Sequence, residues 1–282
     1  MKSTVYVSRL ALTTAFLVVA LLSCKKDDNT ATPGPDLALA TTSVGSVIAG
    51  EGGKTLYFFA PDVAGDATCS GTCLTNWPIY YKETPTIGTG LKASDFATIT
   101  RADGAKQTTF KGWPLYYFKN DVNAGDVLGD KVGGTWMVAK AHYTVMLASR
   151  QLVGNDGKSY TFDTKEGTGN SIFLTDSVGR TLYAFAPDKF NKNTYTKADL
   201  SNNPTWPIFE TSVTVGDIPS VLNKADFATI TAVGKTQLTY KGWPLYYFGP
   251  DAAQRGSTKG VSVPRPGVWP VVNSTSPTAP NQ

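Results

Sequence analysis

The feature that most constrains the fold of this chain is an internal duplication. The phrase KGWPLYYF occurs at residues 111–118 and again at 241–248, an offset of 130 residues. Such a duplication indicates that each half of the chain forms the same structural unit. Three further pairs of phrases recur at similar offsets: TLYFFAPD at 55–62 with TLYAFAPD at 181–188, NWPIYY at 76–81 with TWPIFE at 205–210, and DFATIT at 95–100 with 226–231.

A shorter motif, Tyr-x-Phe-x-x-Asp, occurs twice within each half. In every copy a leucine precedes the tyrosine. The four copies predict a repeated structural strand followed by a turn. They consist of Tyr57, Phe59 and Asp62; Tyr116, Phe118 and Asp121; Tyr183, Phe185 and Asp188; and Tyr246, Phe248 and Asp251.

The composition favours an all-β protein. The chain has 13 Tyr, 13 Phe, 27 Gly and 17 Pro, a mixture typical of short strands joined by turns, and few stretches have helical periodicity. We predict two tandem homologous antiparallel β units, at residues 41–147 and 148–272. Because the motifs are spaced by 59, 67 and 63 residues, a single four-bladed propeller is the alternative.

The aspartate of each motif falls where the chain must leave the sheet. There it is expected to accept hydrogen bonds from backbone amides, which is a structural role. Asp126 and Asp130 follow Asp121 closely, so a calcium site is the alternative, although their spacing is not that of a calcium loop. The position between the motif Tyr and Phe varies, and Tyr117 and Tyr247 occupy it in two copies. These two tyrosines are the places within the repeated strands where a function is expected.

The N-terminus predicts export. Residues 1–23 contain a basic start and the apolar run from Leu10 to Leu22, which is short for a membrane-spanning helix. We therefore predict a signal peptide, with an uncleaved anchor helix as the alternative. The run ends in Leu-Leu-Ser-Cys at residues 21–24, which resembles the lipobox of bacterial lipoproteins. The resemblance implies acylation of Cys24, and acyl chains would attach the protein to a membrane.

Residues 24–40 are expected to form a lipidated, solvated tether. The lysines and aspartates that follow Cys24 are similar to the signal that sends some lipoproteins to the cell surface. The expected location is the bacterial cell envelope at the outer membrane, with surface exposure as an extension of that expectation. Residues 273–282 lack apolar content and are predicted to be a disordered tail.

Cys69 and Cys73 are separated by three residues in a chain that is expected to be exported, which favours a local disulfide. The alternative is a copper or thiol-redox site formed with His142, which is the only histidine. Met137 or Met146 would then lie nearby. The second half lacks the cysteine pair, so a cysteine-dependent activity cannot belong to both halves.

Several function classes find no support in the sequence. The net charge is +4 and falls to +2 without residues 1–23, which is too little for a nucleic-acid-binding face. No phosphate loop, dinucleotide fingerprint, zinc-protease helix or nucleophile elbow is present. No cofactor or metal is predicted. A glycoside hydrolase remains an alternative because acidic residues are plentiful, yet no spacing singles out a pair.

The four motifs, the cysteine pair ahead of Trp-Pro and the lipobox together resemble a family of secreted repeat lipoproteins. That family is named for a Tyr-x-(Phe/Trp/Tyr)-x-x-Asp motif, and its function is unassigned. The resemblance covers residues 44–270. We therefore expect an exported, lipid-anchored, non-catalytic binding or structural module. Its partner would be an envelope protein or a glycan.

Overall fold

The computed structural model describes residues 1–4, 34–211 and 217–281. Residues 34–282 form one compact unit. Cys24, nearly all of the predicted signal peptide and most of the predicted tether lie outside the described residues. The first strand begins at Ala38, and Leu37 is fully buried, so the fold starts a few residues before the predicted end of the tether. Within the described ranges, no helix has the length and apolarity needed to cross a membrane.

The first half, residues 34–144, is built from short strands and single helical turns. Its elements, with η denoting a 3-10 helix, are β1 (Ala38–Thr42), β2 (Gly45–Ala49), η1 (Glu51–Gly53), β3 (Tyr57–Phe59), η2 (Ala60–Ala64), α1 (Thr72–Asn76), η3 (Ala93–Asp95), β4 (Phe96–Thr100), β5 (Lys106–Phe110), β6 (Trp113–Pro114), η4 (Val132–Gly134) and β7 (Trp136–Val138).

The second half, residues 145–281, repeats this plan with longer strands. Its elements are β8 (Val145–Val153), β9 (Ser159–Tyr160), β10 (Asn170–Asp176), β11 (Tyr183–Ala184), η5 (Lys224–Asp226), β12 (Phe227–Ala232), β13 (Lys235–Tyr240), β14 (Trp243–Tyr246), η6 (Gly249–Asp251) and η7 (Lys259–Ser262).

All strand pairs within the described residues are antiparallel, which confirms the predicted all-β class. The sheets of the first half are β1-β2, β3-β7 and β4-β5-β6, and those of the second half are β10-β8-β9 and β11-β14-β13-β12. The hairpin β4-β5-β6 corresponds to β12-β13-β14, so the internal duplication of sequence is also a duplication of structure.

The repeated Lys-Gly before each Trp-Pro is a tight turn. Lys111 and Gly112 have φ angles of 48° and 79°, and Lys241 and Gly242 have φ angles of 50° and 82°. Two successive positive φ angles are typical of the two-residue turn that joins antiparallel strands. The phrase KGW therefore recurs because both halves need the same hairpin turn.

The motif strands pair two by two within each half. Tyr57 pairs with Tyr116, and Tyr183 pairs with Tyr246, in antiparallel register. A propeller would instead place one motif strand in each of four blades around one axis. The pairing therefore favours two tandem β units over the propeller alternative.

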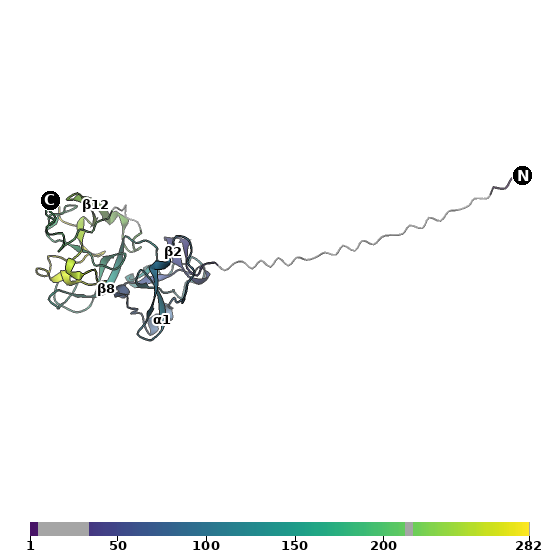
Figure 1. The fold of residues 1–282 in the computed structure, drawn as a ribbon, viewed down its shortest axis with the longest axis horizontal. Coiled ribbons are helices and arrows are strands. Elements are labelled where there is room, and N and C mark those ends of the chain that lie inside the picture. The colour runs from purple at the N-terminus through teal and green to yellow at the C-terminus, as the bar shows by residue number, and fades with distance from the viewer. Residues whose placement is uncertain (5–33, 212–216, 282) are drawn as a thin grey trace. The chain divides into compact units, whose positions relative to one another are not determined.

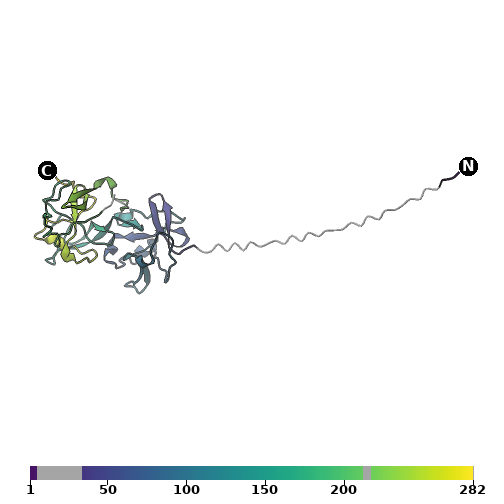
Figure 2. The ribbon, with the colours of Figure 1, turned by 45° about the horizontal axis from the view of Figure 1, so that its top comes forward.

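The two β repeat units share one core and do not form separate domains. A single cluster of buried side chains includes Phe58 and Leu115 from the first half and Leu147 and Leu245 from the second. The predicted boundary at residues 147 and 148 falls inside β8, and this boundary is wrong because β8 is a continuous strand paired with β10. In both views the purple-to-blue residues of the first half and the green-to-yellow residues of the second lie at opposite sides of the compact unit (Figure 1, Figure 2).

The last residues differ from the predicted disordered tail. Ala279 is only 4% exposed, and its N–H donates to the carbonyl of Lys241 at 2.9 Å. The indole N–H of Trp243 donates to the carbonyl of Pro277 at 2.9 Å, and the ammonium of Lys241 donates to the carbonyl of Ser276 at 3.0 Å. The segment has few apolar side chains, but its backbone carbonyls satisfy donors of the β13–β14 turn, which composition cannot indicate.

Candidate functional site

The two motifs of the first half exchange hydrogen bonds. The hydroxyl of Tyr57 donates to Asp121 at 2.5 Å, and the hydroxyl of Tyr116 donates to Asp62 at 2.7 Å. Each tyrosine therefore bonds the aspartate of the other motif, not its own. The exchange follows from the antiparallel pairing of Tyr57 with Tyr116, which brings each ring beneath the turn that ends the opposite strand.

The second half repeats this exchange. Tyr183 donates to Asp251 and Tyr246 donates to Asp188, both at 2.7 Å. In both halves the rings and the carboxylates are buried. The two tyrosines and two aspartates of each half thus join its two motifs through buried hydrogen bonds, which is a structural role.

The motif aspartates also accept bonds from the loops that follow them, as the sequence predicts. Asp62 accepts from the backbone N–H of Thr68 at 2.7 Å, and Asp188 accepts from that of Thr194 at 2.7 Å. Burial raises the pKa of all four aspartates above the usual value, and for Asp62 it raises the pKa to about 6. Burial and the adjacent carboxylates raise the pKa of the four tyrosines as well, so their hydroxyls remain donors.

Tryptophan pairs pack beside the motifs. Trp77 and Trp136 stack with ring centroids 3.6 Å apart, and Trp206 and Trp269 stack at the same distance. All four side chains are buried. They belong to the core and do not form an exposed sugar platform.

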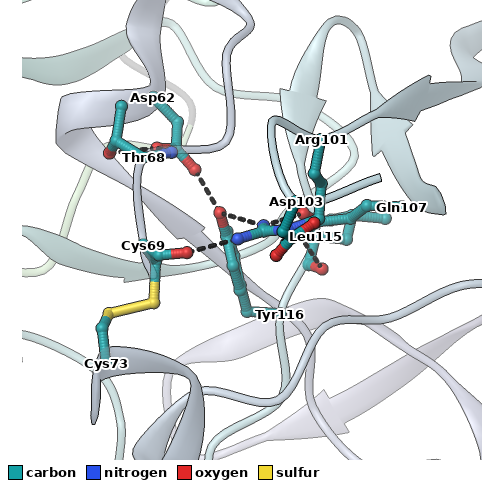
Figure 3. Close-up of a disulfide and its surroundings, with 9 residues drawn as sticks. All are labelled: Asp62, Thr68, Cys69, Cys73, Arg101, Asp103, Gln107, Leu115 and Tyr116. Carbon is teal, nitrogen blue, oxygen red and sulfur yellow. Dashed lines mark hydrogen bonds and ion pairs between the residues drawn. A yellow bond between two sulfur atoms is a disulfide. The ribbon is translucent and has the colours of Figure 1, made fainter. Parts of the chain in front are cut away.

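The Cys69–Cys73 disulfide predicted from the sequence is present and closes the loop after Asp62 (Figure 3). Arg101 points at this loop from the β4–β5 turn, and it donates to the carbonyl of Cys69 and, at 2.5 Å, to the amide oxygen of Gln107. Its guanidinium also lies 3.5 Å from the hydroxyl of Tyr116. The disulfide and Arg101 together fix the loop against the motif strand.

The copper alternative loses its ligands in this arrangement. The sulfurs of Cys69 and Cys73 are bonded to each other, so neither is a thiolate. His142 is exposed, between the buried residues Ala141 and Tyr143. In the described ranges, no three His, Cys, Asp or Glu side chains are grouped so as to hold a metal ion.

The aspartates after Asp121 have separate roles. Asp126 accepts from the backbone N–H groups of Val122 and Asn123, and Asp130 accepts from that of Val138. Asp126 therefore organises its own turn and Asp130 bonds to strand β7, and the calcium alternative gains no support from their positions.

A pocket of about 280 Å³ opens beside Tyr247 in the second half. Its walls combine apolar side chains, among them Pro207 and Phe248, with the polar groups of Arg180 and Asp251. The guanidinium of Arg180 lies 4.3 Å from the centre of the Tyr247 ring and donates to its hydroxyl at 3.0 Å.

Asp176 holds the wall of this pocket in place. Its carboxylate pairs with Arg180 at 2.6 Å and accepts from the hydroxyl of Tyr247 at 3.0 Å. Burial, together with the charge of Asp176, raises the pKa of Tyr247 well above its usual value, so this hydroxyl stays protonated.

The first half has an equivalent pocket of about 500 Å³ beside Tyr117. Lys54, Pro78, Phe118 and Asp121 occupy the positions that Arg180, Pro207, Phe248 and Asp251 take in the second half. Gly50 replaces Asp176, and a Cβ atom at residue 50 would lie 2.5 Å from the hydroxyl of Tyr117. That hydroxyl accepts from the backbone N–H of Glu51 instead.

Sequence reasoning located Tyr117 and Tyr247 but missed the cations beside them. Lys54 and Arg180 stand at equivalent places directly before the repeated Thr-Leu-Tyr, so a basic residue at both positions was the available signal. In the other two copies the variable position is buried, since Phe58 and Ala184 are each 1% exposed. Those two side chains face the shared core.

Comparison with known families identifies the repeat. The model of a family described as a secreted repeat of unknown function matches residues 38–80, 97–140 and 228–273. The chain belongs to this family of secreted repeats. Each matched segment contains one Tyr-x-Phe-x-x-Asp motif, and the fourth motif, at Tyr183, lies in the unmatched stretch between the second and third matches. No curated protein and no solved structure gives a significant match.

Proposed function

We propose that this secreted-repeat protein is a lipid-anchored, non-catalytic binding module of the bacterial cell envelope, and that its pockets beside Tyr117 and Tyr247 bind units of an envelope glycan. The observation that carries the proposal is the equivalent pocket in each half. The family is described as secreted, which supports an extracellular or envelope location. The lipobox-like residues that end at Cys24 support anchoring through acyl chains.

The chemistry of the pockets suits a sugar. Aromatic and proline side chains offer apolar contact, and Arg180 or Lys54 at the rim offers a hydrogen-bond donor. The carboxylate in the second pocket, Asp251, already accepts bonds from Tyr183 and Ser257. Such a carboxylate has a structural role, which supports binding rather than hydrolysis.

Two equivalent sites in one compact unit suit a polymer. A glycan presents the same unit repeatedly, so occupation of one pocket raises the effective concentration of ligand at the other. Weak single sites then give a useful combined affinity, with a gain of about 10²–10⁴.

Binding of the compact unit, residues 34–282, to a panel of envelope glycans tests this proposal. Arg180→Ala removes the cation of one pocket and Lys54→Ala that of the other, while Lys92→Ala, at an exposed site outside both pockets, is the control. We expect each pocket variant to weaken polymer binding by about a hundredfold, and a single sugar unit to lose only one site. Failure of every glycan to bind, or equal binding by the pocket and control variants, contradicts the proposal.

Anchoring is tested separately with Cys24→Ala in the full chain. We expect the unchanged chain to fractionate with membranes and to incorporate a labelled fatty acid, and the variant to lose both properties. A variant that stays in the membrane fraction without label would support the uncleaved anchor helix instead.

A further inference from the structure

The second half contains a segment that the first half lacks. Strand β1 passes to β2 through a tight turn at residues 43–44, whereas β8 reaches β10 through residues 154–169, which include β9. The extended end of β8 contacts η7, and the hydroxyl of Thr258 accepts from the backbone N–H of Val153 at 2.8 Å. The added segment and the loop that follows Asp251 therefore meet and form a surface that has no counterpart in the first half.

A pocket of about 340 Å³ lies at this meeting point. Three cationic side chains line it, namely Arg150, Arg255 and Lys259, and none of its other lining residues is acidic. Within the described residues, none of the three cations forms an ion pair. Gly125 and Gly256 are equivalent, because their N–H groups donate to the carbonyls of the equivalent residues Gly53 and Gly179. Arg255 therefore corresponds to Ala124 in the first half, so the charge is specific to the second half.

Arg255 is held in place without any carboxylate. Its Nε donates to the carbonyl of Val63 at 2.8 Å, and its Nη1 donates to the carbonyls of Lys111 and Val178. The guanidinium lies 4.9 Å from the ring centre of Trp113, and its Nη2 is buried without a hydrogen-bond partner. Burial lowers the pKa of Arg255 to about 10, so the group remains protonated at neutral pH with no ion pair.

Arg150 approaches the same pocket across a glycine. A Cβ atom at Gly256 would lie 2.9 Å from Nη1 of Arg150, and Gly256 has a φ of 63°, so a side chain there would be both crowded and strained. Lys259 is exposed at the rim. Arg150, Arg255 and Lys259 thus all line one concave surface, and the guanidinium of Arg255 lies behind it against Trp113.

The nearest carboxylates have other partners. Asp156 accepts from the hydroxyl of Tyr160, and Asp251 accepts from the hydroxyl of Tyr183 and the backbone N–H of Lys259. Asp176, whose charge favours the protonated form of Arg255, is paired with Arg180. These carboxylates reduce the positive potential, but none lines the pocket.

We propose that the pocket formed by Arg150, Arg255 and Lys259 is an oxyanion-binding site, which takes a phosphate or carboxylate group of a small molecule or of a glycan substituent. Guanidinium groups match the paired oxygens of both anions. The site is independent of the pockets beside Tyr117 and Tyr247, because no cation is shared between them.

Titration of residues 34–282 with inorganic phosphate, glucuronate and neutral glucose at low ionic strength, followed by calorimetry, tests the proposal. We expect phosphate or glucuronate to bind, glucose not to bind, and added sodium chloride to weaken binding. A preference for phosphate over glucuronate, or the reverse, identifies the anion class.

Variants assign the binding to this pocket. Arg150→Gln and Lys259→Gln should each weaken anion binding roughly tenfold, and Lys92→Gln, with the same loss of charge at an exposed site elsewhere, should not. Lys259→Gln changes an exposed side chain and should fold normally, which thermal unfolding without ligand checks. The proposal is overturned if neither anion binds, or if Lys259→Gln and Lys92→Gln bind alike.

Discussion

The two halves of the molecule close the same loop with different chemistry. In the first half, the loop after Asp62 is closed by the Cys69–Cys73 disulfide. In the second half, Tyr195 stands in the place of Cys69, and the amide of Asn202 donates to the carbonyl of Tyr195 at 2.7 Å. The fold therefore requires the loop to be closed at this place, and it accepts either a covalent bond or a hydrogen bond.

The side chain that donates to the buried glutamine behind this loop also differs between the two halves. Gln107 and Gln237 are equivalent, and each donates to the carbonyl of the leucine in a motif strand. The amide oxygen of Gln107 accepts from Arg101, which lies on the hairpin, whereas that of Gln237 accepts from Asn193, which lies on the loop. A buried acceptor thus keeps a donor in both halves, although the donor comes from a different element.

The largest expected effect tests what the halves have in common. Trp77→Ala and Trp206→Ala each remove one ring of a buried stack, and each should lower the free energy of unfolding by about 3–5 kcal/mol. Chemical denaturation measures both. If one loss falls within about 3–5 kcal/mol and the other falls outside it, the two stacks are not equivalent.

The pH dependence of stability tests the first half. The pKa of Asp62 is raised from 3.8 to about 6 by burial, so the folded protein binds a proton that the unfolded chain releases. The contribution of Asp62 to the free energy of unfolding is fully present below about pH 4. It is lost as the pH rises through about 6, which lowers the free energy of unfolding by up to about 3 kcal/mol.

Asp62→Asn cannot ionise and should flatten this part of the pH profile, even though it also weakens the bond to Thr68. Denaturation between pH 4 and pH 8 measures the difference between the two proteins. An unchanged slope would mean that Asp62 does not carry a raised pKa.

Removing the side-chain donors Arg101 and Asn193 should give smaller and unequal losses in the free energy of unfolding. Arg101→Ala leaves the oxygens of Gln107 and Cys69 without that donor and should cost about 2–3 kcal/mol. Asn193→Ala removes the donor to Gln237 and should cost about 1 kcal/mol. Equal losses on denaturation would contradict the view that the first half depends on its buried arginine more than the second half depends on its amide.

The loop closures predict the smallest effect. Replacing Cys69 and Cys73 together by serine opens a short ring and should cost about 2 kcal/mol. Asn202→Ala should cost about 1 kcal/mol. Hydrogen exchange should show faster opening of residues 69–76 in the first variant only, and unfolding of the whole chain by either change would contradict the comparison.

The sequence predicts the all-β class and the duplication because repeated phrases and alternating strands are local signals. It also predicts the disulfide, since Cys69 and Cys73 are close in sequence. The exchange of bonds between motifs was not predictable, because Tyr57 and Asp121 are 64 residues apart and their contact depends on strand pairing. The oxyanion pocket depends on the approach of residues 150 and 255 in space, which no local pattern encodes.

The central claim is that each motif tyrosine stabilises the aspartate of the other motif. A double-mutant cycle with Tyr116→Phe tests it, using Asp62→Asn for the partner across the pair and Asp121→Asn for the aspartate of the same motif. We predict a coupling free energy of about 1–2 kcal/mol for Tyr116 with Asp62 and additivity within about 0.5 kcal/mol for Tyr116 with Asp121. Additivity for the first pair, or equal coupling in both, would contradict the account.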